Sequence, residues 1–181
     1  MTSFLLAIIA SIGLMTTPVT TKTIDAAQST ITWEGKKVTG KHSGTINIKE
    51  GSFEFDGAKV VGGSFVIDMT SLEVTDLKGD MAGKLAGHLK SPDFFDVANH
   101  PTATFNLHSV NDEGSVYGHL TIKGITKPIS FDAEFSNNGA TAKIIVDRTK
   151  FDVRYGSGSF FDNLGDKAIY DEFTLNVNLV M

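Results

Sequence analysis

KLAGHLKSPDFFDVANHPTATF, residues 84–105, breaks a pattern that the rest of the chain keeps. On both sides of this stretch, apolar and polar residues alternate with a period of two, which is typical of half-buried β-strands. Just before and inside it, Met81, Leu85 and Leu89 recur every fourth residue, as on one face of a helix. We therefore expect a helix over residues 77–90, inserted into a β-architecture.

A second helix start and an aromatic hook follow directly. Ser91-Pro92-Asp93 resembles a helix N-terminus, because serine caps the first turn and proline lacks an N–H that this turn leaves unpaired anyway. Phe94 and Phe95 come next. We expect the whole insertion to close one mouth of a barrel as a lid that moves during loading. The predicted lid residues are Met81, Leu85, Leu89, Phe94 and Phe95.

The chain after Thr23 consists of short alternating runs separated by turn signals. Glu50-Gly51 predicts a tight turn, and Asp56-Gly57 and Asn137-Asn138-Gly139 predict hairpins. Residues 129–135 alternate Ile, Phe, Ala and Phe with Ser, Asp and Glu. Eight or nine such runs predict an all-β fold, a closed antiparallel barrel of about eight strands with the helical insertion near one mouth.

The interior of such a barrel is either filled by side chains or just wide enough for one small ligand. Alternating apolar residues are core by default, so a filled interior is the simpler interpretation. A ligand cavity lined by the same side chains is the alternative. The predicted inward-facing residues are Trp33, Phe53, Phe55, Phe65, Phe105, Leu120, Phe131, Phe135 and Phe173.

Composition excludes several classes of protein. A net charge of -5 disfavours nucleic-acid binding, which requires a basic surface. A hydrophobic content of 41% with 20% charged residues argues against disorder. The chain has no cysteine, which excludes disulfides, thiolate catalysis and a lipidated cysteine anchor.

The N-terminus resembles a secretory signal. Residues 1–21 carry no charged side chain, and residues 4–15, FLLAIIASIGLM, form an apolar run too short to span a bilayer comfortably. We expect a signal peptide over residues 1–20, one domain over residues 22–181, and a periplasmic or secreted protein. A buried N-terminal strand or helix is the alternative, because Met1-Thr2-Ser3 lacks a basic side chain.

No catalytic or metal-binding pattern stands out. The five histidines are scattered, and Asp96 with His100 would supply only two of the three or four ligands that a metal needs. We therefore predict a protein that is not an enzyme, with no metal and no cofactor. Arg148 and Arg154 are candidates for binding a polar headgroup, although pairing with the neighbouring Asp147 and Asp152 is the alternative.

Six segments in order resemble the YceI-like lipid and polyisoprenoid-binding family. They are residues 23–25 (TID), 29–33 (STITW), 88–97 (HLKSPDFFDV), 101–105 (PTATF), 118–129 (GHLTIKGITKPI) and 147–151 (DRTKF). The resemblance covers nearly the whole chain from Thr23 to Met181. Two segments depart from it: a short run with Lys36, Lys37 and Lys41, and a glycine-rich one at 155–170.

This resemblance implies an exported, elongated, lipocalin-like barrel that holds a long isoprenoid chain in an apolar tunnel. It thus favours the ligand cavity over the filled interior, and it implies no catalytic residues. The predicted function is non-catalytic carriage or storage of a polyprenyl lipid or isoprenoid quinone, with transient membrane contact and a monomeric or homodimeric state. The alternative is a ligand-free structural or interaction barrel involved in envelope stress response.

Overall fold

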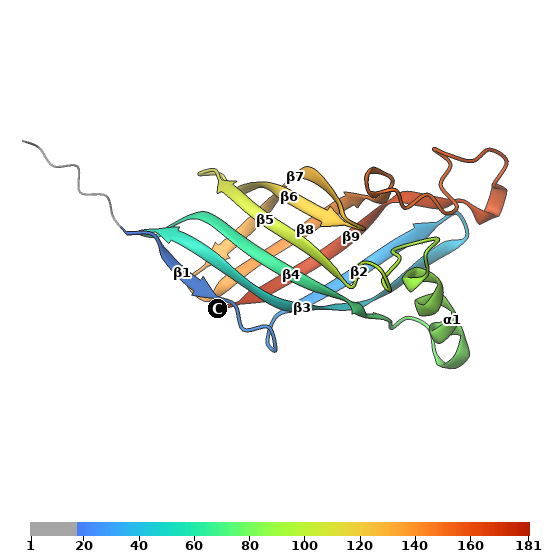
Figure 1. Ribbon diagram of the computed structural model, residues 1–181, viewed down its shortest axis with the longest axis horizontal. Helices are drawn as coiled ribbons and strands as arrows, with labels where there is room; N and C mark the ends of the chain where they lie inside the picture. Colours follow the sequence, from blue (N-terminus) through green and yellow to red (C-terminus); the bar gives the residue numbers. More distant parts are fainter. Residues whose placement is uncertain (1–17) are drawn as a thin grey trace, which may run out of the picture.

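A computed structural model describes residues 18–181, which form one elongated β-barrel with a helix at one end (Figure 1). The elements are β1 (Thr20–Thr23), β2 (Thr30–Lys37), β3 (Gly40–Asp56), β4 (Lys59–Val74), α1 (Gly79–Lys90), β5 (Thr102–Val110), β6 (Ser115–Ile122), β7 (Ile125–Ser136), β8 (Gly139–Asp147), the 3-10 turns η1 (Arg148–Phe151) and η2 (Gly165–Lys167), and β9 (Ile169–Val180). The predicted signal segment, residues 1–20, lies outside the described residues except for its last three.

Strands β2 to β9 close into a ring of eight. The order is β2-β9-β8-β7-β6-β5-β4-β3, and β3 pairs again with β2, always antiparallel. Strand β1 lies outside this ring and pairs with the last part of β3, with Lys22 opposite Phe53. The predicted closed antiparallel barrel of about eight strands with one helical insertion is therefore confirmed.

The predicted turn at Glu50-Gly51 is wrong, because β3 runs unbroken from Gly40 to Asp56. Its pairing with β4 shifts register between Ile48 and Glu50 instead. Before this shift the buried residues have even numbers, such as Ile46 and Ile48, and after it they have odd numbers, such as Phe53. A β-bulge produces this shift, since one extra residue reverses the side of the sheet that each later side chain faces.

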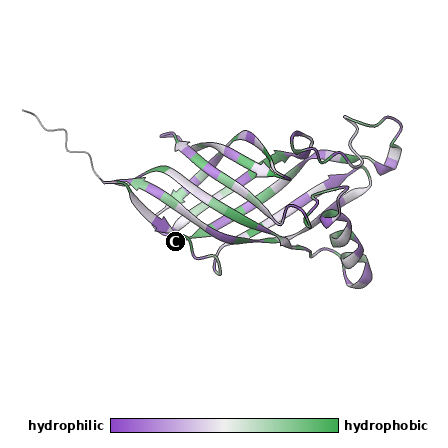
Figure 2. Ribbon diagram, viewed as in Figure 1, coloured by the Kyte–Doolittle hydropathy of each residue, from purple (hydrophilic) through white to green (hydrophobic). Residues whose placement is uncertain are grey.

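Hydrophobic and hydrophilic residues alternate along the strands (Figure 2), and the burial pattern places most of the apolar side chains inside the barrel and the polar ones outside. At the end remote from α1, Phe53, Phe65 and Phe135 come from three strands and pack edge to face. Their ring centroids lie 4.9 Å apart for Phe53 and Phe65 and 5.9 Å apart for Phe53 and Phe135. Aromatic contacts of this geometry add to the free energy of burial, so this end of the barrel is filled.

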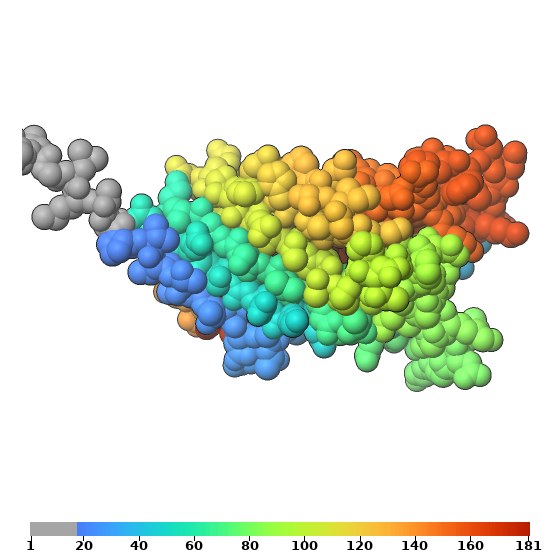
Figure 3. All heavy atoms as spheres, viewed as in Figure 1, coloured from blue at the N-terminus to red at the C-terminus, as the bar shows by residue number. Residues whose placement is uncertain are grey.

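Helix α1 stands out from the barrel (Figures 1 and 3). It begins two residues later than predicted, because Lys78 is extended and Gly79 has a φ of 57°. None of its residues is buried, and Met81 at its free end is 62% exposed. The other end is attached to the barrel, where Lys90 Nζ donates to the Thr70 carbonyl at 2.8 Å. Within residues 18–181, no helix is long and apolar enough to cross a membrane.

The predicted second helix at Ser91-Pro92-Asp93 is wrong. The Ser91 side chain caps the C-terminus of α1 instead, donating to the His88 carbonyl at 2.7 Å, and the backbone N–H of Ser91 donates to the same oxygen at 3.1 Å. The chain then turns back beneath the helix, where the N–H of Phe95 donates to the Leu89 carbonyl. The N···O distance of 3.1 Å is typical of a hydrogen bond. This turn, rather than a new helix, directs Phe94 and Phe95 into the barrel.

Replacing Gly83 by alanine should stabilise α1 by about 1 kcal/mol, because alanine has the higher helix propensity and no atom lies within 4 Å of the position of the new Cβ. The measurement is amide hydrogen exchange over residues 79–90, which should slow. Gly79→Ala is the control and should speed exchange, since its φ of 57° is unfavourable for alanine. Slower exchange in both variants would contradict this account.

Candidate ligand-binding site

The barrel encloses two apolar compartments. The inner compartment, about 110 Å³, lies among strands β2 to β9, and the helix-side compartment, about 130 Å³, lies beneath α1 and the hook that follows it. Ile31, Ile67, Leu120 and Leu175 line both, so the two compartments adjoin as neighbouring parts of the apolar cavity of the barrel. Each volume is much larger than the 10–15 Å³ or so that a single water requires.

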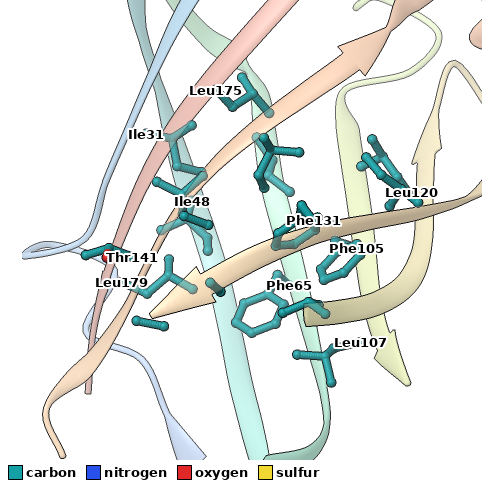
Figure 4. A pocket seen from close by; sticks show the side chains of 18 of the residues that line it. Ile31, Ile48, Phe65, Phe105, Leu107, Leu120, Phe131, Thr141, Leu175 and Leu179 are labelled. Atoms are coloured by element: carbon teal, nitrogen blue, oxygen red, sulfur yellow. The ribbon is translucent and has the colours of Figure 1, made fainter. Parts of the chain in front are cut away.

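Eight of the nine predicted inward-facing residues lie on this cavity. The inner compartment is lined by Phe53, Phe65, Phe105, Leu120, Phe131 and Phe135 (Figure 4), and the helix-side compartment by Trp33, Leu120 and Phe173. Phe55 is the exception. It is buried but lines neither compartment, and Lys22 Nζ lies 4.9 Å above its ring.

The sequence-based set missed the aliphatic half of the lining. The same alternation that selected the phenylalanines also marks these residues, and an emphasis on aromatic side chains left them out. Among the missed residues are Ile31, Ile48, Ile67, Leu107, Ile129, Ile144, Leu175, Val177 and Leu179 (Figure 4).

The predicted lid divides into two parts. Leu89, Phe94 and Phe95 line the helix-side compartment, whereas Met81 and Leu85 line neither compartment. The rings of Phe94 and Phe95 lie 5.0 Å apart, and Phe95 lies 6.2 Å from Phe173 on β9. The hook thus closes this end of the cavity, while most of α1 projects away from it because the helix is attached only near Lys90.

Arg148 is the one charged side chain in the lining of the two compartments, as described over residues 18–181. It is only 2% exposed, and three of its N–H groups donate to backbone carbonyls: Nε to Tyr170 at 3.1 Å, Nη1 to Val153 at 2.7 Å and Nη2 to Ile169 at 3.0 Å. Its guanidinium carbon also lies 5.5 Å above the ring of Phe94. A buried cation is stable only with such partners.

Two opposing effects act on the pKa of Arg148. Burial lowers the pKa of its guanidinium, and the charges of Asp171 and Asp147 raise it, with burial the larger effect. The carboxylate that faces it is Asp171, with Oδ1 3.6 Å from Nη2, rather than Asp147, which sequence reasoning had offered as a partner. Burial raises the pKa of Asp171, but hydrogen bonds from Ser157 and Ser159 and the charge of Arg148 outweigh it, so this pKa lies below its ordinary value.

Arg154 lies away from the cavity. Its Nε is 2.5 Å from Asp152 Oδ1, its side chain is 56% exposed, and its guanidinium lies 4.8 Å above the ring of Phe160. The pairing with Asp152 that sequence reasoning left open is therefore present, and of the two arginines only Arg148 reaches the lining.

Histidines and carboxylates form no compact cluster near the cavity. Asp96 and His100 lie 3.9 Å apart, and Asp96 adopts a φ of 49° rather than a helical conformation. The structure also joins His108 and His119, with Nε2 and Nδ1 2.6 Å apart on the neighbouring strands β5 and β6, although the two residues are 11 positions apart in the sequence. Across residues 18–181, no group of three or more histidines and acids could hold a metal ion.

A closed antiparallel ring around an apolar cavity defines the class of small β-barrels that can enclose a ligand. Within this class, the chain belongs to the YceI-like family, because the sequence profile of the YceI-like domain matches residues 23–181.

Curated relatives of the chain carry the name UPF0312 protein. The one from Vibrio campbellii is 36% identical over 102 residues, which cover 53% of this chain and 51% of that protein. The one from Azotobacter vinelandii is 33% identical over 100 residues, which cover 53% of this chain and 50% of that protein. The chain thus spans about half the length of the curated relatives it matches.

Solved structures share the fold at low sequence identity. BcnA from Burkholderia cenocepacia superposes with a TM-score of 0.63 at 24% identity, covering 87% of this chain and 99% of that one. A domain from Saccharophagus degradans, described as a polyisoprenoid-binding domain implicated in plant cell wall breakdown, superposes with a TM-score of 0.59 at 14% identity, covering 87% of this chain and 95% of that one.

Replacing Arg148 by alanine should lower the free energy of unfolding by about 3–5 kcal/mol, because Asp171 and three backbone carbonyls would lose their partner in a buried site. Urea denaturation measures this loss. Arg148→Lys should lose less stability than Arg148→Ala but should not reach the wild-type value. The planar guanidinium of arginine reaches three carbonyls at once, and the compact ammonium of lysine cannot. Arg154→Ala, at an exposed pair, is the matched control and should change stability little. Equal effects at the two arginines would contradict the assigned role of Arg148.

The acid side of the stability profile should depend on Asp171. Because its pKa is lower in the folded protein than in the unfolded chain, its carboxylate contributes stability above its ordinary pKa of 3.8, and this contribution is lost as the pH falls through the lowered value. Urea titrations of the wild type and Asp171→Asn should therefore differ by a constant amount near neutral pH and converge below about pH 4. A constant difference down to pH 2 would be inconsistent with this assignment.

Proposed function

We propose that this protein binds an amphiphilic isoprenoid lipid, a polyprenyl lipid or an isoprenoid quinone, and carries or stores it without chemical change. The observation that supports this proposal is an apolar cavity of two adjoining compartments with a single charged side chain, Arg148, in its described lining. That lining includes no carboxylate, histidine or serine, which favours binding over turnover. Membership of the YceI-like family and the fold shared with a polyisoprenoid-binding domain agree with this function.

Burial of the chain supplies the affinity. Each methylene transferred from water into the cavity contributes about 0.8 kcal/mol. A chain of roughly forty carbons would on this basis exceed the strongest known non-covalent affinities, near -20 kcal/mol, so the ordering of the chain must offset much of the gain. Chain length alone therefore cannot set specificity, and the polar headgroup must contribute.

We place the headgroup beside Arg148 in the helix-side compartment. A guanidinium has five N–H groups, and three of those of Arg148 donate to backbone carbonyls. The remaining two can donate to an oxygen of a bound headgroup at this one charged side chain of the described lining. In this arrangement the chain extends from Arg148 past Leu120 into the inner compartment, where the phenylalanines surround it.

Export and membrane contact complete the proposal. The uncharged residues 1–21 with their apolar run support secretion to the periplasm or beyond. A carrier in that compartment exchanges its lipid by transient contact with a membrane, as a monomer or homodimer. The competing function is a ligand-free structural or interaction barrel in the envelope stress response, which the edge-to-face packing of Phe53, Phe65 and Phe135 favours because those rings already fill one end.

Native mass spectrometry of the mature protein, purified gently from a bacterial periplasm, tests the proposal. We expect a single adduct whose mass matches a polyprenyl lipid or quinone after solvent extraction. A bare mass that stays unchanged after incubation with polyprenyl lipids would favour the ligand-free barrel.

Phe131→Glu should abolish lipid retention, because a carboxylate in the apolar lining opposes burial of the chain. Tyr117→Glu is the matched control on the outer surface, where Tyr117 is 47% exposed, and should keep its lipid. The readout is the lipid-bound fraction in native mass spectra, with circular dichroism to verify folding. Full lipid occupancy in a folded Phe131→Glu protein would refute the assignment of this compartment.

A further inference from the structure

One seam of the barrel is largely unpaired. Strands β7 and β8 pair through only four residues of each, from Ala133 opposite Ala142 to Ser136 opposite Gly139. By contrast, β7 pairs with β6 through eight residues, and β8 pairs with β9 along its whole length of nine. Beyond the hairpin the two strands diverge, as Figure 4 shows, so residues 125–132 of β7 and 143–147 of β8 form no ladder with each other.

The inner compartment extends to this seam. Ile129 and Phe131 on β7 and Ile144 on β8 line it from the two sides, and all three are half-exposed. On the opposite wall, Ile48 and Phe53 on β3 and Phe65 on β4 line the same compartment and are buried, whereas Ile67 on β4 is half-buried. The apolar lining is therefore more exposed on the β7–β8 side than over most of the opposite wall.

Lys127 occupies an unusual position at the seam. It pairs with Leu120, whose side chain lines both compartments, and residues directly opposite each other in antiparallel strands face the same side of the sheet. Lys127 thus has the register of an inward-facing residue, yet it is exposed. A lysine can satisfy both conditions by laying its methylenes over apolar surface while its ammonium stays in water.

Both ends of the barrel are closed. Phe94 and Phe95 cover the helix-side end, and Phe53, Phe65 and Phe135 fill the remote end. At the wide end of the seam, η1 contacts β7, and Lys123 Nζ donates to the Asp152 carbonyl at 3.2 Å. The seam is thus bounded on every side but is not itself sealed by a backbone ladder.

We propose that the unpaired part of the β7–β8 seam is the lateral portal through which the apolar chain of the ligand passes, with Lys127 as the side chain that covers it. This inference rests on the proposed function. A long chain can pass sideways through the seam along its length, without being threaded past the aromatic rings at either end. Widening this part of the seam breaks no strand pairing, whereas widening any fully paired seam would break ladder hydrogen bonds.

Bridging the seam tests the portal. If the register of the paired part is continued, Ser130 and Ile145 lie opposite each other on the outer face, and the chain has no cysteine of its own. The double variant Ser130→Cys with Ile145→Cys is bridged by a short bis-maleimide, and the bridge is verified by mass. Retinol, a fluorescent isoprenoid, serves as the probe in stopped-flow measurements. The control is Glu134→Cys with Thr141→Cys, a pair within the four-residue ladder.

Bridging Ser130→Cys to Ile145→Cys should slow both uptake and release of retinol at least tenfold, whereas bridging the control pair should change neither rate. Unchanged rates in the bridged protein would overturn the portal while leaving the proposed function in place. A wild-type protein that takes up no retinol and carries no lipid would overturn the proposed function, and the portal with it.

The role of Lys127 has its own measurement. Lys127→Ala removes the methylenes over the seam. It should accelerate the uptake and the release of retinol by the same factor, which leaves the equilibrium affinity unchanged. Lys127→Met retains a long aliphatic side chain without the charge and should exchange retinol at the wild-type rate. A faster release with unchanged uptake in Lys127→Ala, which weakens the affinity, would assign Lys127 to ligand binding and overturn its role as the cover of the portal.

Discussion

Closure of the ring is the constraint on which the rest of the structure depends. Once β3 pairs with both β2 and β4, every strand of the eight-stranded sheet has a neighbour on both sides, and every second side chain faces a single interior. The large apolar residues at these positions must then share one enclosed space. They fill it fully only at the end where Phe53, Phe65 and Phe135 meet, and elsewhere they line a cavity.

Arg148 joins the strand framework to the irregular segment that follows β8. Through one guanidinium it binds the carbonyls of Val153 in that segment and of Ile169 and Tyr170 at the start of β9. The fold thus positions a buried cation at the wall of the cavity and leaves part of its donor capacity unused. In the proposed function, the same group that stabilises this end of the barrel would also be the partner of a polar headgroup.

Sequence reasoning was most reliable where side chains alternate. The inward positions of Trp33, Phe105 and Phe173 followed from period two alone, because a strand allows only two directions for a side chain. It failed at residues 91–93, where a serine followed by a proline is as compatible with a turn as with the start of a helix. Hydrogen bonds at the C-terminus of α1 produce the turn. It also gave too much weight to Met81, since a helical stripe does not reveal which end of the helix contacts the barrel.

The sequence by itself determined the strand content, the set of side chains that shares one face of each strand, the helical insertion and the resemblance to the YceI-like family. These properties depend on local periodicity and on matching segments. Only the tertiary structure decided that the interior contains two adjoining apolar compartments, that Arg148 rather than Arg154 reaches their lining, and that β7 and β8 separate. These features depend on packing between residues far apart in the chain, where small differences in register and ring volume decide whether space is filled or left open.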